Sequence, residues 1–95
     1  MSGTYQVIKC GASGHNVRSR PSLKSSPVGM LVLGNRLGIT EYVVNTDGCW
    51  VLLDDATKEK YCFDTDNEAW SLAIGKNNVL YLENVNEADK SKRER

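Results

Sequence analysis

Two arginines separated by a single residue, Arg18 and Arg20, are the side chains best suited to bind a charged ligand. A guanidinium group carries a permanent positive charge and a planar fork of N–H donors, which matches carboxylate and phosphate groups. Val17 is β-branched and predicts a short strand in which its own side chain faces inward. By the two-residue period of a strand, both arginines then point outward. We therefore expect this pair to bind an anionic group.

Charge is unevenly distributed along the chain, although the formal net charge is zero. Residues 1–40 contain five basic and no acidic residues, whereas residues 41–75 contain eight acidic and two basic residues. This polarity leaves two interpretations of the arginines open. They either meet an acidic or phosphorylated peptide, or form ion pairs with the acidic half of the same domain. Nucleic-acid binding through the basic first half is a third option, which a net charge of zero does not favour.

Aromatic residues supply the second group of candidate binding residues. Tyr42, Trp50 and Trp70 lie in separate β-prone segments. Tyrosine and tryptophan serve as rigid anchors at protein interfaces, but they equally fill the core of a small domain. We expect one peptide-binding groove lined by Arg18, Arg20, Tyr42, Trp50 and Trp70. Packing of the tryptophans in the core is the alternative.

Signals for catalysis or metal binding are weak. His15 is the only histidine, and Cys10, Cys49 and Cys62 form no Cys-x-x-Cys pair, so a structural zinc site lacks ligands. Residues 64–68 are rich in carboxylates but lack the glycine and the bidentate glutamate of an EF-hand loop. We expect a protein that is not an enzyme, has no cofactor and no metal, and carries three reduced thiols in the cytoplasm.

The segments that must position these residues are short and β-prone. Turn residues separate them at intervals of about ten residues, and Asp47-Gly48 between two of them is a strong hairpin signal. Residues 54–60 are charged, and we expect a loop there. The predicted strands are a short one around Val17 and segments 4–10, 28–33, 37–44, 49–53, 61–63, 69–73 and 79–82.

This pattern predicts a single small domain. Short strands at even spacing, with no periodic helix, favour an all-β barrel or sandwich over residues 4–83. Residues 84–95 are polar and charged, and we expect a disordered tail or linker there. No apolar segment reaches the roughly 20 residues of a membrane span. We expect the isolated domain to be a monomer that binds no membrane.

Three segments resemble the bacterial-type SH3-like (SH3b) domain family. Asn-Val-Arg-Ser-Arg-Pro-Ser at residues 16–22 is similar to the opening motif of that family. Residues 27–34 resemble its following glycine-containing strand, and Gly-Cys-Trp-Val-Leu at residues 48–52 resembles its hairpin exit. Ala-Trp-Ser at residues 69–71 matches a family Gly-Trp-Val only loosely, and the segment 55–68 is longer than usual.

The resemblance covers about residues 5–73 and implies an SH3-like barrel of five to seven short antiparallel strands used for binding. Similar eukaryotic modules occur inside very large multidomain proteins, ubiquitin ligases among them. The function it implies is a non-enzymatic protein-interaction module of a larger intracellular protein, with a peptide as its partner. The alternative is a structural spacer in a large multidomain protein such as a ubiquitin ligase, with no ligand of its own.

Overall fold

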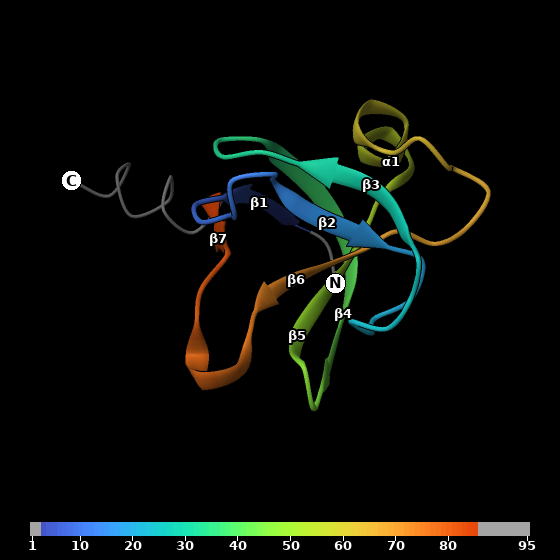
Figure 1. Ribbon diagram of the computed structural model, residues 1–95. Helices are drawn as coiled ribbons and strands as arrows, with labels where there is room; N and C mark the ends of the chain where they lie inside the picture. Colours follow the sequence, from blue (N-terminus) through green and yellow to red (C-terminus); the bar gives the residue numbers. More distant parts are fainter. Residues whose placement is uncertain (1–2, 86–95) are drawn as a thin grey trace.

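Seven short β-prone segments pair into one antiparallel sheet in the computed structural model, which describes residues 3–85 (Figure 1). The sheet order is β3-β2-β6-β5-β4-β1-β7. This architecture confirms the prediction of a small all-β fold built from five to seven short antiparallel strands. The strands are β1 (Gly3–Val7), β2 (His15–Arg18), β3 (Pro27–Leu31), β4 (Arg36–Asn45), β5 (Gly48–Leu53), β6 (Trp70–Ile74) and β7 (Leu82–Asn84).

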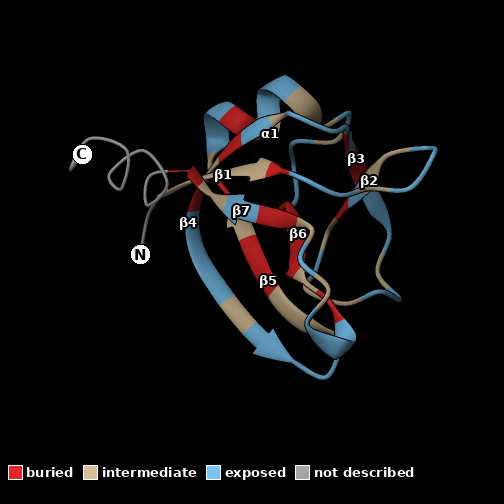
Figure 2. Ribbon diagram, turned by 90° about the vertical axis from the view of Figure 1, so that its left-hand side faces the viewer, coloured by how far each residue is buried: buried red, intermediate tan, exposed pale blue. Residues whose placement is uncertain are grey.

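The sheet curls so that its two edge strands, β3 and β7, contribute to the same core. Val17 is completely buried in this core, as the period of β2 predicts. Figure 2 shows buried residues along the inner strands and exposed residues along much of β4. The cluster consists of Val7, Val17, Val28, Leu31, Leu37, Ile39, Val51, Leu53, Ala69, Ala73 and Leu82.

A second, smaller cluster lies on the other face of β5 and β6. It consists of Trp50, Trp70 and Leu72, all of them buried. Successive residues of a strand point to opposite faces, so Trp50 turns away from the main core that Val51 enters. Both faces of β5 and β6 are therefore covered by side chains. In many antiparallel sheets, by contrast, one face is exposed to solvent.

The charged segment 54–60, which we predicted as a loop, forms most of the helix α1 (Asp55–Tyr61), so that prediction is wrong. Asp54 caps the helix, because its Oδ1 accepts a hydrogen bond of 2.9 Å from the backbone N–H of Thr57. Thr57 is buried, and its Oγ1 accepts a hydrogen bond of 2.9 Å from the backbone N–H of Gly38 on β4. Tertiary contacts thus stabilise a helix too short to stand alone. No helix within residues 3–85 is long and apolar enough to cross a membrane.

Several predicted strands also differ from the structure in extent. The first, predicted over 4–10, ends at Val7. Val32 and Leu33 are 52% and 64% exposed and follow β3 rather than extend it. In the segment 61–63, only an isolated bridge between Cys62 and Gly29 is formed. The final strand is β7 and pairs with β1 instead of turning back on β6, where Leu80 forms only a bridge. A turn of 3-10 helix, η1 (Lys76–Asn78), lies between β6 and β7.

The predicted domain end at residue 83 stays a prediction. Asn84 ends β7 and Val85 is buried, at 6% exposure. The rest of the predicted tail, residues 86–95, lies outside the described residues.

The side chain of Ser71 is expected to lower the stability of the domain. It is completely buried, and its hydroxyl has no hydrogen-bond partner within the described residues. It lies between Val17 of β2 and Val51 of β5 in the ladder. Removing an unsatisfied hydroxyl from such a site is expected to raise the free energy of unfolding by about 0.5–1.5 kcal/mol.

Urea denaturation of Ser71→Ala checks this. Ser26→Ala, which removes the same group from an exposed position, is the matched control and should change little. A loss of stability in Ser71→Ala would mean that the hydroxyl has a partner after all.

Candidate binding site

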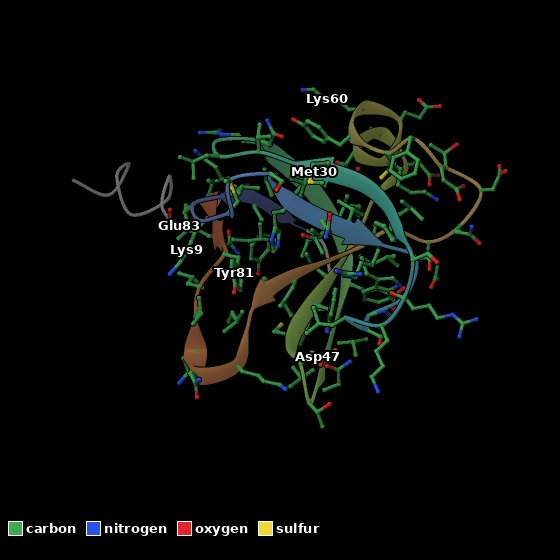
Figure 3. All side chains as sticks on the ribbon, in the orientation of Figure 1. Lys9, Met30, Asp47, Lys60, Tyr81 and Glu83 are labelled. Carbon is green, nitrogen blue, oxygen red and sulfur yellow. The ribbon has the colours of Figure 1, made fainter. Side chains whose placement is uncertain are left out.

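A hollow of about 200 Å³ opens over the neighbouring strands β2, β6 and β5. It is smaller than the roughly 300–1,000 Å³ of typical small-molecule sites, and it suits a single side chain. Figure 3 shows Tyr81, one of its walls, on the segment between β6 and β7. We call it the aromatic hollow, and its principal lining residues are His15, Arg18, Leu23, Trp50, Leu72 and Tyr81.

His15 is fixed by two contacts in the aromatic hollow. Its ring stacks on Tyr81, with the ring centroids 5.0 Å apart and an interplanar angle of 20°. Its Nε2 lies 2.7 Å from the carbonyl oxygen of Leu72, so Nε2 carries the hydrogen. Burial lowers the pKa of His15 below its ordinary value of 6.5; the hydrogen bond to Leu72 opposes this shift, and the charge of Arg18 adds to it. The imidazole is therefore neutral at pH 7.

The lowered pKa of His15 predicts a loss of stability in mild acid. Because the unfolded chain takes up the proton at higher pH than the folded chain, stability is lost as the pH falls through 6.5 toward the folded pKa. In His15→Gln this contribution is absent, so its free energy of unfolding should depend less steeply on pH between about pH 7 and 5. Urea denaturation of both proteins over this range measures the difference. Two parallel pH profiles would contradict the prediction.

Arg18 is held in position without neutralising its charge. Its Nη1 donates a hydrogen bond of 2.8 Å to the carbonyl oxygen of Ser25. Within residues 3–85, neither Arg18 nor Arg20 forms an ion pair, so the structure does not support pairing with the acidic half of the domain there. Arg18 therefore lines the aromatic hollow as a fixed positive charge.

The structure does not bring the five predicted binding residues into one groove. Arg18 and Trp50 do share the aromatic hollow, but Trp50 is only 1% exposed and forms its floor. Arg20 is exposed and lines a different hollow, because β2 ends at Arg18 and the two-residue period does not reach Arg20. The prediction of a single groove is wrong for this residue.

Tyr42 and Trp70 lie away from the aromatic hollow for two different reasons. Tyr42 is 51% exposed and pairs with Val51, so it occupies the face of the β4–β5 hairpin opposite to Trp50. Trp70 is 5% exposed, and its Nε1 donates a hydrogen bond of 3.1 Å to Oε1 of Glu68. The core alternative therefore describes Trp70 correctly, and it also describes Trp50, which belongs to the same buried cluster.

The chain between β2 and β3 closes one side of the hollow and is tied to the tip of the β4–β5 hairpin. Nδ2 of Asn45 donates a hydrogen bond of 2.7 Å to the carbonyl oxygen of Pro21. Oδ1 of Asn45 accepts a hydrogen bond of 3.2 Å from Nε1 of Trp50. Oδ2 of Asp47 accepts a hydrogen bond of 3.1 Å from the backbone N–H of Leu23. Figure 3 labels Asp47 at the tip of the hairpin. These bonds place Leu23 at the hollow.

Sequence reasoning missed four of the six principal lining residues of the aromatic hollow, His15, Leu23, Leu72 and Tyr81. His15 directly precedes the motif at residues 16–22, and this position was the one sequence signal that could have placed His15 in the binding site. Tyr81 carries no local signal, because its partner His15 is far away in the chain.

The remaining reactive groups show no arrangement for chemistry in the described residues. Cys10, Cys49 and Cys62 are free thiols, and burial raises the pKa of Cys49 and of Cys62, which disfavours the nucleophilic thiolate. No group of three or more potential metal ligands occurs within residues 3–85. Asp64 instead closes a local turn, where its Oδ1 accepts 3.0 Å from the N–H of Asp66.

Comparison with known proteins finds a similarity to part of a much longer protein. No family model and no solved structure matches the chain. The chain is 32% identical over 75 residues to the E3 ubiquitin-protein ligase MYCBP2 of the zebrafish Danio rerio. The matched region covers 77% of this chain but only 2% of that protein. The chain is thus similar to a small segment of a very large ubiquitin ligase.

Proposed function

We propose that the domain is a non-enzymatic protein-interaction module of a larger intracellular protein, and that it binds an acidic or phosphorylated peptide at the aromatic hollow. The position of Arg18 carries this proposal. Its guanidinium lines the hollow, is fixed by Ser25 and has no acidic partner within the described residues. A fixed arginine beside aromatic walls offers both a charge and an apolar surface to one peptide side chain.

Three further observations support this setting. The similarity to a segment spanning 2% of a large ligase supports a domain of a larger multidomain protein. The three free cysteines support a reducing, cytoplasmic environment. The motif at residues 16–22 resembles that of SH3b domains, which supports a binding role for a monomeric module. The net charge of zero argues against nucleic acid or an anionic membrane as the partner.

A structural spacer is the competing function. The similarity to a segment of a large ligase supports a spacer equally well, because a spacer also belongs to a multidomain protein. The two functions differ in the role they give to Arg18. A binding module explains an unpaired charge in a hollow, whereas a spacer does not require one. Binding measurements therefore separate them.

An array of short peptides with glutamate, phosphoserine, serine or lysine at the central position tests the proposal. We expect the glutamate and phosphoserine peptides to bind, and Arg18→Ala to weaken their binding about tenfold or more. The matched control is Arg36→Ala, which removes the same charge from an exposed position on β4, outside the aromatic hollow.

The melting temperature of both variants is measured in parallel, because Arg18 also bonds to Ser25. If no peptide binds the wild-type domain, the spacer function is favoured. Equal weakening in both arginine variants would show that binding depends on overall charge and not on this site.

A further inference from the structure

The loop between β2 and β3, residues 19–26, surrounds a second hollow of about 350 Å³. We call this segment the serine loop. The lining residues are Ser19, Arg20, Ser22, Lys24, Ser25 and Ser26, so the hollow has two cations and no acidic side chain. Neither cation forms an ion pair within residues 3–85. The serine loop therefore presents an unneutralised positive charge around a concave surface.

The serine loop is held in shape by its own hydrogen bonds. A hydrogen bond of 2.9 Å from the N–H of Ser19 to the carbonyl oxygen of Ser26 closes the base of the loop. The hydroxyl of Ser25 lies 2.7 Å from the carbonyl oxygen of Ser22 and 3.0 Å from that of Arg20. Arg18 supports the same turn through its bond to the carbonyl oxygen of Ser25. A ligand would thus meet a site that is already ordered, which lowers the entropic cost of binding.

The free hydrogen-bond donors of the serine loop match a phosphate group. The hydroxyls of Ser19, Ser22 and Ser26 donate no hydrogen bond within the described residues, and Ser22 Oγ only accepts one from the N–H of Lys24. A phosphate monoester carries a charge of about −1.5 to −2 near pH 7 and three strong acceptor oxygens. A carboxylate carries a single charge on two oxygens. Two cations and three hydroxyl donors therefore complement the phosphate better.

We propose that the serine loop binds the phosphate group of a phosphorylated peptide. This inference rests on the proposed peptide-binding function, and it places the acidic group of the ligand, a phosphate monoester, on the serine loop beside Arg18. Arg18 joins the two sites, because it lines the aromatic hollow and bonds to Ser25 of the serine loop. A peptide with its phosphate on the loop then places a neighbouring side chain in the aromatic hollow. Asp47, an acidic group bonded to the loop at Leu23, does not line the second hollow.

The test uses the full 95-residue chain and three versions of one short peptide, with phosphoserine, serine or glutamate at the same position. Titration calorimetry should show that the phosphoserine peptide binds about tenfold or more tightly than the other two. Inorganic phosphate should compete with it. The double variant Arg20→Ala, Lys24→Ala should lose this preference. The matched control Lys9→Ala, Arg36→Ala, which removes the same two charges from exposed positions elsewhere, should keep it.

Four other results would overturn the inference. Equal affinity for the phosphoserine and glutamate peptides, or equal weakening in both double variants, removes the phosphate site but leaves the binding of acidic peptides standing. Binding to phosphatidylcholine vesicles that contain phosphatidic acid, with no peptide binding, would identify a membrane site and overturn both proposals. The absence of binding to peptides and vesicles alike would also overturn both.

Discussion

Trp50→Ala is expected to lower the free energy of unfolding by about 3–5 kcal/mol. Trp50 is 1% exposed and forms the smaller core cluster together with Trp70 and Leu72. Its removal leaves a cavity in that cluster and also deletes the hydrogen bond to Asn45. A small domain has only about 5–15 kcal/mol of stability in total, so this variant should be partly unfolded near body temperature.

Thermal and urea denaturation measure this effect, with an expected fall in melting temperature of roughly 15–30 °C. Tyr42→Ala is the control, because it truncates an aromatic side chain of the same hairpin that is 51% exposed. The control should cost less than about 1 kcal/mol. Similar losses in the two variants would show that Trp50 is not the core residue described above.

Gly48→Ala is expected to cost about 3 kcal/mol or more, for two separable reasons. Gly48 begins β5 with a φ of +133°, a conformation that residues with a Cβ rarely adopt. A Cβ at this position would also collide with the carbonyl group of Ile74 on the neighbouring strand β6. Neither backbone can move aside without breaking the pairing of β5 with β6.

The chain offers a control that separates the two causes. Gly34 also has a positive φ, of +89°, but a Cβ there meets no atom within 4 Å. Gly34→Ala should therefore cost only the conformational penalty of about 1–2 kcal/mol. Chemical denaturation of both variants gives the comparison. If the two substitutions cost the same, the close approach of β5 and β6 is not a constraint on the fold.

Strands and turns were predictable because their signals are local. The Asp47-Gly48 signal places the β4–β5 hairpin correctly, although the two residues of the turn are 46 and 47 and Gly48 already belongs to β5. Val17 was predicted to face inward from its neighbours alone, and it is completely buried. In such segments side-chain pattern and turn residues act over a few positions, so a single sequence suffices.

The helix and the aromatic hollow were not predictable, because contacts between distant residues create them. The seven residues of α1 have no apolar stripe, and the buried Thr57 is bonded to Gly38 on another element, β4. The contact of His15 with Leu72 joins positions 57 residues apart. Sequence alone could name Arg18 and Trp50 as candidates, but their common hollow depends on how β2, β6 and β5 are ordered in the sheet.

The central claim is that the aromatic hollow is a binding site, and an NMR titration tests it most directly. The phosphoserine peptide is added to the ¹⁵N-labelled domain while the amide and indole N–H signals are followed. We predict that the indole signal of Trp50 and the amide signals of His15, Arg18 and Tyr81 shift together. The signal of Tyr42, on the other face of the hairpin, should stay in place. Shifts confined to the Tyr42 face, or no shifts at saturating peptide, would contradict the claim.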